Sequence, residues 1–334
     1  MKLKLFFFVS VFVINSFLNY VLAQDTTSVL FIGNSFTFYN NMPGLFKDIA
    51  TSKGKIVHVD TAVTGGKDLK FHSTRERTYN LIKSRKWDFI VLQGHSNEFA
   101  QPDFKVDSLT YPFAKKIVDS IRTYSKCSRI LFYMTWGYKN GNQKWKAIAT
   151  YDSMQYRIER QYLRFADKLN VGVCPVGMVW KEVREFNPEI NLYNDDRFHP
   201  ILTGSYLSAC TFYTTIFGET PYKNSAIVEL HPFQKEVIEL AATKIVLNNL
   251  ARWRYIPKQP SLVPGFDVLQ KNDVVEVYSN AKNHLSQTWD FGDNTISMDE
   301  KPTHKYSNRG EYVIKQKISD FCKLITLERK ITIN

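Results

Sequence analysis

The chain has 334 residues, of which 44% are hydrophobic and 14% aromatic, and its net charge is +12. This length allows one large domain and a second, smaller one. Its basic residues are scattered without a dense basic helix, which argues against nucleic acid as a partner.

The first 23 residues have the pattern of a secretory signal peptide. Lys2 and Lys4 precede a run of 19 mostly apolar residues that ends in Val21-Leu22-Ala23, a site of the kind that signal peptidase cleaves. An uncleaved anchor is the alternative, because such a run nearly spans a bilayer. Loss of the two lysines would lower the net charge from +12 to +10. We expect a secreted, periplasmic or cell-surface protein without membrane insertion after signal removal.

The segments between residues 27 and 250 alternate between strand-like apolar runs and helical periodicity. Expected strands are Val29–Ile32, Ile56–Val59, Phe89–Leu92, Ile130–Met134 and Val171–Val176; expected helices are Leu45–Ser52, Arg75–Ser84, Phe113–Tyr124, Asp152–Lys168, Thr203–Phe217 and Phe233–Leu250. Buried strands separated by helices are typical of a parallel sheet with helices on both faces. We therefore predict an α/β domain with a doubly wound parallel sheet over residues 24–254.

Residues 255–264 contain three prolines and are predicted to be a linker. After it, residues 265–334 hold alternating segments such as "DVVEVYS" and "LITLERKITI", which predict a small all-β domain.

The cysteines are four in number, and no two are closer than 36 residues. This spacing excludes a CxxC metal or redox motif. One disulfide is possible in an oxidising compartment, but three of the four lie in apolar or strand-like runs, which favours buried thiols. They are Cys127, Cys174, Cys210 and Cys322.

The serine in "LFIGNSFT" is the first candidate functional residue. Ser35 follows the first strand at the sheet edge where doubly wound folds bind ligands, although serine is also a common helix cap. A nucleophilic serine needs a base and a third group that orients the base. Among the seven histidines, only His199 has a carboxylate at a suggestive offset, Asp196. The alternative is that Asp195 or Asp196 caps the following helix.

These two motifs resemble the SGNH/GDSL hydrolase (esterase) family. "LFIGNSFT" is similar to the first block of the family and "DRFH", from Asp196 to His199, to the last, and the resemblance covers about residues 27 to 250. It implies a flavodoxin-like, three-layer fold and a catalytic set of Ser35, His199 and Asp196. It implies neither a cofactor nor a catalytic metal.

The resemblance also implies an oxyanion hole, formed by the backbone N–H of Ser35, a glycine amide and a side-chain amide. The glycine block resembles "TAVTGGKDL", with Gly65 as the match and Gly66 as the alternative. The third block departs from the usual Gly-x-Asn, since "QGHSNE" is more similar to the branch that contains carbohydrate acetylesterases. This points to Gln93, with Asn97 as the alternative. Loss of one such donor typically costs about 3 kcal/mol of transition-state stabilisation.

Rival chemistries lack their motifs in this sequence. There is no Gly-x-Ser-x-Gly elbow and no His-Glu-x-x-His, which argues against an α/β-hydrolase and a catalytic zinc. Four aromatic residues near expected strand ends are candidates for stacking on sugars, although core packing is the commoner role of such rings: Tyr39, Trp136, Tyr138 and Trp145.

Residues 288–319 resemble the PKD repeat, an immunoglobulin-like β-sandwich of extracellular proteins. The match rests on Trp289-Asp290-Phe291-Gly292-Asp293 and on a later His304-x-Tyr306-x-x-x-Gly310-x-Tyr312, with Asn294 where glycine is usual. We expect a tight turn at 292–294 and a core of Trp289, Phe291 and Tyr312. Asp290 and Asp293 are candidate calcium ligands, but turn acids more often accept backbone N–H groups. The resemblance implies a spacer, or contact with glycan or another surface protein.

The sequence therefore predicts an exported serine esterase that removes O-acyl groups, acetyl above all, from carbohydrate. Its substrate would be a small-molecule or polysaccharide ester. The alternatives are a catalytically silent glycan-binding surface protein and an esterase of lipids or other carboxylic esters.

Overall fold

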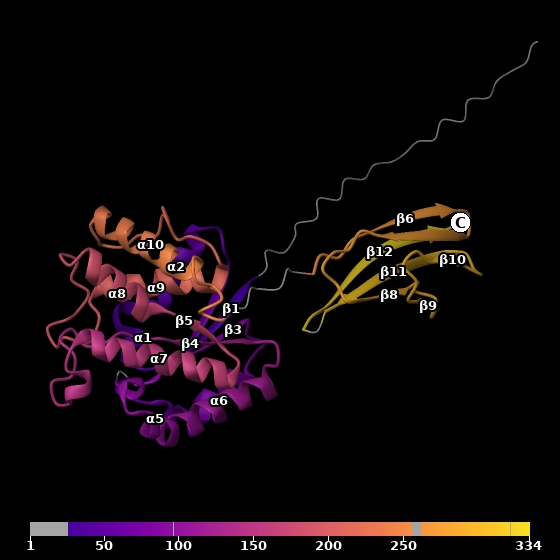
Figure 1. Cartoon of the computed structure of the whole chain (residues 1–334). Helices are drawn as coiled ribbons and strands as arrows, with labels where there is room; N and C mark the ends of the chain where they lie inside the picture. The colour runs from indigo at the N-terminus through magenta and orange to yellow at the C-terminus, as the bar shows by residue number, and fades with distance from the viewer. Residues whose placement is uncertain (1–25, 96, 256–261, 321) are drawn as a thin grey trace, which may run out of the picture.

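The computed structural model of the chain describes residues 26–95, 97–255, 262–320 and 322–334. The predicted signal segment and most of the predicted linker lie outside these residues. These residues form an α/β domain and a β-sandwich (Figure 1). The α/β domain has a hydrophobic core on each face of its sheet, and the β-sandwich has a core of its own. In the described part of the chain, none of the helices has the length and apolar character needed to span a membrane.

Five parallel strands form the sheet of the first domain, in the order β2-β1-β3-β4-β5. They are β1 (Thr27–Gly33), β2 (Val57–Val63), β3 (Phe89–Leu92), β4 (Arg129–Tyr133) and β5 (Gly172–Cys174). This is the flavodoxin-like strand order, in which the direction of winding reverses between β1 and β3. The carboxyl ends of these two strands therefore border the crevice where such folds bind ligands.

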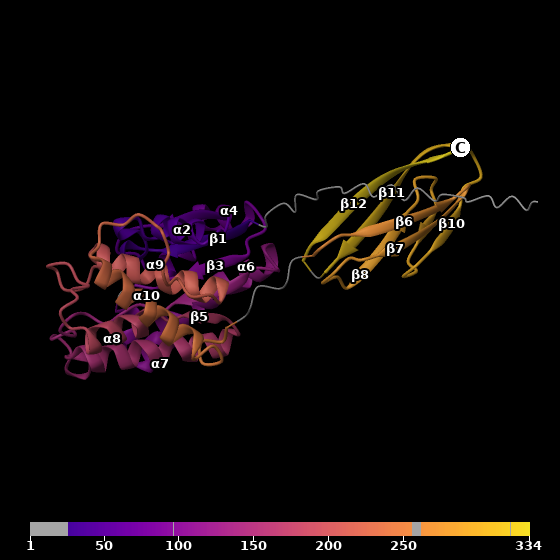
Figure 2. The same ribbon diagram turned by 90° about the horizontal axis from the view of Figure 1, so that it is seen from above.

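Helices cover both faces of this sheet (Figures 1 and 2). The α-helices are α1 (Ser35–Phe38), α2 (Met42–Ser52), α3 (Leu69–His72), α4 (Glu76–Lys83), α5 (Asp103–Leu109), α6 (Tyr111–Tyr124), α7 (Tyr151–Leu169), α8 (Val176–Phe186), α9 (Leu202–Phe217) and α10 (Pro232–Leu247). Three short 3₁₀ segments, η1 (Tyr39–Asn41), η2 (Glu98–Ala100) and η3 (Lys146–Ile148), lie in the connections.

The side chains of each strand alternate between the two helical layers, because successive residues of a strand point to opposite faces. Val29 and Phe31 of β1 pack into the core with α2, α8, α9 and α10. Leu30 and Ile32 pack into the other core with α4, α6 and α7. Burial on both faces explains the continuous apolar runs in the sequence.

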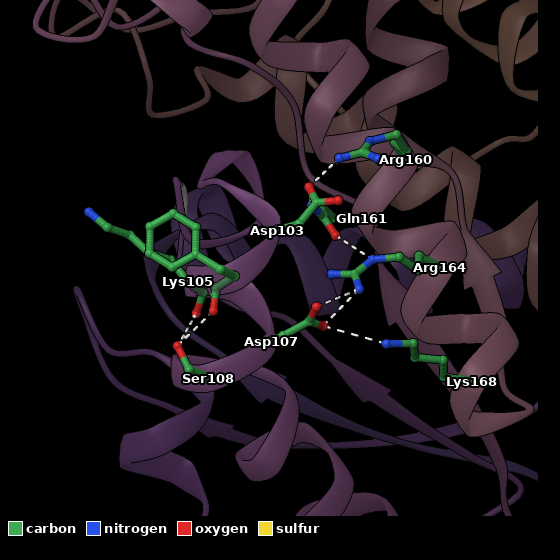
Figure 3. A network of polar contacts seen from close by, with 9 residues as sticks. Asp103, Lys105, Asp107, Ser108, Arg160, Gln161, Arg164 and Lys168 are labelled. Atoms are coloured by element: carbon green, nitrogen blue, oxygen red, sulfur yellow. Dashed lines mark hydrogen bonds and ion pairs between the residues drawn. The ribbon is translucent and has the colours of Figure 1, made fainter.

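Ion pairs hold α5 against α7 (Figure 3). Asp103 pairs with Arg160 and accepts a hydrogen bond from Gln161 Nε2 at 2.7 Å. Arg164 Nη1 donates to both oxygens of Asp107, at 2.7 and 2.9 Å. These contacts fix the far end of the connection that leaves β3.

The second domain consists of two antiparallel sheets. One has the order β10-β7-β6 and the other β12-β11-β8-β9. The strands are β6 (Phe266–Lys271), β7 (Val274–Ser279), β8 (Ser286–Asp290), β9 (Ile296–Ser297), β10 (Thr303–Lys305), β11 (Gly310–Ser319) and β12 (Leu324–Ile333). Trp289 and Phe291 are buried in its core as expected, together with Tyr306, whereas Tyr312 packs against that core partly exposed.

The turn after β8 has the expected form. Gly292 and Asn294 both have left-handed backbones, with φ of 80° and 70°, and the Phe291 N–H donates to Thr295 O at 3.0 Å. Asparagine tolerates this conformation better than most residues, which explains how Asn294 replaces the usual glycine.

The two acids of this turn accept hydrogen bonds from the protein itself. Asp290 accepts from the Gly292 N–H at 3.1 Å, and Asp293 accepts from the Thr295 N–H at 3.0 Å and contacts His304 Nε2 at 2.7 Å. Among the described residues, no group of three or more His, Cys, Asp or Glu is arranged to hold a metal ion.

A disulfide joins Cys127 to Cys322, with 5.6 Å between their Cα atoms. Buried thiols were expected instead; that expectation is wrong for this pair and confirmed for Cys174 and Cys210. Cys127 lies two residues before β4, and Cys322 lies between β11 and β12, so the bond connects the two domains. The separation of 195 residues along the chain hides this pairing from sequence analysis.

Candidate active site

Ser35 is the first residue of α1, directly after β1 and Asn34. The capping role considered for Ser35 belongs to Asn34, whose Oδ1 accepts the Phe36 N–H at 3.1 Å. The Ser35 hydroxyl is therefore available for another partner, and it lies 2.8 Å from Nε2 of His199.

His199 lies on a tight loop between α8 and α9. Tyr193 and Pro200 form an antiparallel bridge, and the Asn194 N–H donates to His199 O at 2.8 Å. The turn closes at Arg197, which has a left-handed φ of 68° and donates its N–H to Asn194 O at 2.9 Å. The tip of the loop thus faces the turn Gly33-Asn34-Ser35, called the nucleophile turn below.

The two carboxylate oxygens of Asp196 have different hydrogen-bond partners. Oδ1 accepts the backbone N–H groups of Phe198 and His199, at 3.0 and 2.9 Å. Oδ2 lies 2.6 Å from His199 Nδ1. The spacing of three residues therefore lets one carboxylate shape the loop and hold the imidazole. The alternative, capping of α9, is wrong for Asp196, since the N-cap of that helix is Ile201 and no side chain caps it.

The contact with Asp196 selects the tautomer of the neutral His199 ring. A carboxylate only accepts hydrogen bonds, so in that neutral ring Nδ1 carries the proton and Nε2 presents a lone pair to the Ser35 hydroxyl. Partial burial opposes ionisation of Asp196, but the hydrogen bonds from Phe198 and His199 outweigh it and lower the pKa of this carboxyl. The His199 side chain is 16% exposed and that of Asp196 34%, which leaves the pair accessible to substrate.

Gln93 and His72 stabilise the nucleophile turn through hydrogen bonds to its backbone. Gln93 is fully buried, and its Oε1 accepts from the Asn34 N–H at 2.8 Å and from Thr37 Oγ1 at 3.0 Å. Burial lowers the pKa of His72, so its neutral ring donates from Nε2 to Gly33 O at 2.9 Å. His72 was missed in the sequence, because a single histidine far from its partner has no neighbouring motif that would reveal this role.

The glycine block lies beside the same turn. The Thr64 N–H donates to Gly33 O at 3.1 Å, and Nδ2 of Asn34 donates to Lys67 O at 2.8 Å. Gly66 has a left-handed φ of 66°, whereas Gly65 faces the ring of Phe38. The residues on either side of the two glycines thus contact the turn that leads to Ser35. The choice between Gly65 and Gly66 as donor stays a prediction.

The side-chain amide of the oxyanion hole also stays a prediction. The contacts of Gln93 with the nucleophile turn use its oxygen, and its Nε2 points to Gly94 O. Asn97 is half-buried in the same connection, with its Oδ1 3.2 Å from His95 Nδ1. Its amide nitrogen makes no hydrogen bond to the residues that the structure describes.

Glu98 anchors this connection and was not singled out from the sequence. Its carboxylate accepts the His95 N–H at 2.8 Å. Burial raises the pKa of Glu98 from 4.5 to about 7, against the opposing effect of that hydrogen bond.

The four aromatic candidates for sugar stacking separate in the structure. Trp136 is fully buried, stacked on Trp180 at 3.9 Å between ring centroids, so it belongs to the core. Trp145 and Tyr138 are half-buried, and Tyr138 lies 5.4 Å from Phe198. Tyr39 stacks directly on the His199 imidazole, at 4.3 Å and an interplanar angle of 5°.

Comparison with known proteins agrees with both domains at the level of fold. A family model of the PKD domain matches the C-terminal part. Residues 269–333 are a PKD domain. The PKD1 domain of Epp from Vibrio anguillarum is similar over 23% of this chain and 98% of that chain, at 20% identity and a TM-score of 0.22.

The first domain has solved structural neighbours. A DUF4886 family protein from Bacteroides uniformis is similar over 67% of this chain and 95% of that chain, with 21% identity and a TM-score of 0.58. A protein from Slackia heliotrinireducens assigned to the SGNH hydrolases is similar over 57% and 98%, with 25% identity and a TM-score of 0.45. No curated protein shows a significant match. The first of these likenesses confirms the expected three-layer α/β fold.

Proposed function

We propose that the protein is an exported serine esterase that removes O-acyl groups from carbohydrate. The observation that carries this proposal is the continuous contact from Ser35 Oγ to His199 Nε2 and from His199 Nδ1 to Asp196, at 2.8 and 2.6 Å. Serine, histidine and aspartate in this order of contact are the groups that nucleophilic acyl transfer requires.

In the proposed reaction, the Ser35 hydroxyl attacks the ester carbonyl while His199 Nε2 takes its proton. Asp196 orients the imidazole and stabilises the imidazolium that forms. Collapse of the tetrahedral intermediate releases the sugar hydroxyl, which receives the proton from His199. Water then attacks the acyl-enzyme, with His199 again as the base, and releases the acid.

The developing oxyanion would be stabilised by the backbone N–H groups of Ser35 and Gly65. The third donor is Gln93 or Asn97. Among the described residues the amide nitrogen of Asn97 has no hydrogen-bond partner, which favours this residue, whereas Gln93 would first have to release its present contacts. A comparison of Gln93→Ala and Asn97→Ala separates the role of oxyanion donor from that of stabilising the nucleophile turn. Loss of the donor should lower kcat and leave the thermal midpoint normal. Loss of the stabilising residue should lower both kcat and the thermal midpoint.

Three features support export and a carbohydrate substrate. The N-terminal segment has the sequence pattern of a signal peptide. A disulfide such as Cys127–Cys322 persists in oxidising compartments. Phe38, 39% exposed and stacked on Tyr39, places an aromatic ring beside the site, and the face of such a ring suits the flat face of a sugar.

The test compares residues 24–334 with the same chain carrying Ser35→Ala. We expect the native chain to release acid from p-nitrophenyl acetate and from acetylated polysaccharides, and the variant to lose at least about 10³-fold in kcat. Preference for long-chain esters over acetylated polymers would replace the carbohydrate proposal with that of a lipid esterase. Equal rates of hydrolysis in both chains would refute Ser35 as the nucleophile. No hydrolysis by either chain would refute an esterase and favour a silent binding protein.

A further inference from the structure

The segment that follows the nucleophile helix has an unusual backbone. Asn40 and Asn41 are consecutive residues with left-handed conformations, with φ of 49° and 52°. Residues other than glycine rarely adopt the left-handed backbone region. Two such residues in succession must be stabilised by contacts with their surroundings. Such a conformation beside a candidate site persists only where the surrounding structure holds it.

The side chain of Asn40 spans two distant parts of the chain. Its Nδ2 donates to Pro200 O at 3.2 Å and to Ser205 Oγ at 2.9 Å. Ser205, on α9, in turn donates to the backbone oxygen of Tyr39 at 3.1 Å. Pro200 directly follows His199 in sequence. Asn40 therefore links the segment of the nucleophile to the loop of the histidine, 160 residues further along the chain.

The neighbouring Tyr39 reaches the same histidine through its ring. The rings of Tyr39 and His199 are parallel within 5° and 4.3 Å apart. On other sides of the imidazole, Phe36 makes an edge contact at 5.6 Å and Phe198 a tilted contact at 4.4 Å. Tyr39 thus restricts the plane of the imidazole, and Asn40 restricts the backbone that carries it.

We propose that Tyr39 and Asn40 form a positioning clamp that sets the distance between Ser35 Oγ and His199 Nε2. The inference rests on the proposed function, because the distance matters only if these two atoms exchange a proton. Tyr39 acts through the face of the imidazole and Asn40 through the backbone after His199, so neither exchanges a proton with Ser35 or His199. The left-handed backbone at Asn40 is what aims its amide across to Pro200 and Ser205.

The two asparagines provide a matched pair of variants. Glycine accepts positive φ without strain, so Asn40→Gly removes the clamp but preserves the backbone conformation. Asn41→Gly makes the same backbone change at a residue whose side chain bonds neither Pro200 nor Ser205. We expect Asn40→Gly to lower kcat at least tenfold with KM within twofold, and Asn41→Gly to keep kcat within twofold.

Two more measurements separate positioning from folding. The rate at which a fluorophosphonate labels Ser35 depends on activation of this serine and not on ester binding, and we expect Asn40→Gly to slow it as much as kcat. Tyr39→Phe keeps the stacked ring and should retain most of kcat, whereas Tyr39→Leu should lose it. If Asn40→Gly fails to fold, the comparison of the two Tyr39 variants decides.

Asn40→Gly with native kcat and native labelling would overturn the clamp, as would equal kcat in Tyr39→Phe and Tyr39→Leu. These outcomes differ from failure of the proposed function. In that case the native chain itself would neither hydrolyse esters nor react with the fluorophosphonate at Ser35.

Discussion

Asp196 shows how one residue can serve both the local backbone and the chemistry. Its Oδ1 holds the loop through two N–H groups, and its Oδ2 holds the His199 ring. The motif can be found in the sequence because both partners of Asp196 lie within three residues of it. The contacts of Gln93 and His72 reach across 39 to 59 residues, and no spacing reveals them.

Replacing Asp196 with asparagine tests this double role. Asparagine is nearly the same size, but its amide favours the wrong tautomer of His199, so we expect kcat to fall about 10³- to 10⁴-fold. Asp195→Asn is the matched control, because the neighbouring carboxylate is exposed and does not contact the histidine. Steady-state hydrolysis of p-nitrophenyl acetate measures both. Similar kcat in the two variants would show that Asp196 only shapes the loop.

Glu98 should make stability depend on pH in the direction opposite to a typical carboxylate. Its pKa is raised from 4.5 to about 7 in the folded chain, so the folded state holds this proton more tightly than the unfolded state. Its contribution to the free energy of unfolding is therefore greatest below about pH 4.5 and is lost as the pH rises to about 7. With allowance for solvent near the carboxyl, the loss amounts to about 1 to 3 kcal/mol.

Urea unfolding at pH 5 and pH 8 measures this effect. We expect Glu98→Gln to flatten the difference between the two midpoints relative to the native chain. Glu300→Gln, at an exposed position, controls for loss of a carboxylate in general. An unchanged pH difference in Glu98→Gln would contradict a role for Glu98 protonation.

At the scale of elements, the end of β1 and the connections after β2 and β3 meet at one sheet edge. Gly33 allows this because it has no side chain: a Cβ there would lie 2.6 Å from both Gln93 Oε1 and Thr37 Oγ1. Gly65, in the neighbouring connection, has room, since its Cβ would meet only Phe38, at 3.7 Å.

The two glycines therefore predict different effects of the same substitution on stability. Gly33→Ala should lower the stability by about 1 to 3 kcal/mol, because the buried turn must shift to admit the methyl group. Gly65→Ala should change it by less than about 0.5 kcal/mol. Thermal unfolding midpoints compare them. A normal midpoint for Gly33→Ala would mean that the turn is looser than its contacts indicate.

The boundaries of the helices and strands could be predicted only in part from the sequence. β1, β3 and β4 were placed within two residues, because charged or turn residues bound their apolar runs. The run at Val171–Val176 was taken as one strand, but β5 ends at Cys174 and α8 begins at Val176. Both elements are buried, so the apolar run does not reveal their boundary. The four-residue helices α1 and α3 are too short for a periodic pattern.

At the scale of the whole molecule, the two domains have a covalent connection besides the linker. Cys127 precedes β4 and therefore lies near the amino edge of the parallel sheet, whereas Ser35 follows the carboxyl end of β1. The disulfide thus attaches the PKD domain at the edge opposite the candidate site.

Cleavage of the linker tests this connection. With a specific protease site inserted between Lys258 and Gln259, the cut chain should remain one species on a non-reducing gel and separate into two fragments after reduction. Thiol titration of the denatured native chain should find two free thiols before reduction and four after. Four thiols without reductant, or fragments that separate unreduced, would contradict the disulfide.

In the proposed reaction, Ser35 forms a covalent acyl-enzyme with the help of His199 and Asp196. The most direct measurement is rapid mixing of the native chain with p-nitrophenyl acetate, an acid quench and mass spectrometry of the peptides. We expect an acetyl group on the Ser35 peptide of the native chain and none in Ser35→Ala or His199→Ala. Release of p-nitrophenol at the native rate without acetyl on Ser35, or with acetyl on another residue, would contradict the claim.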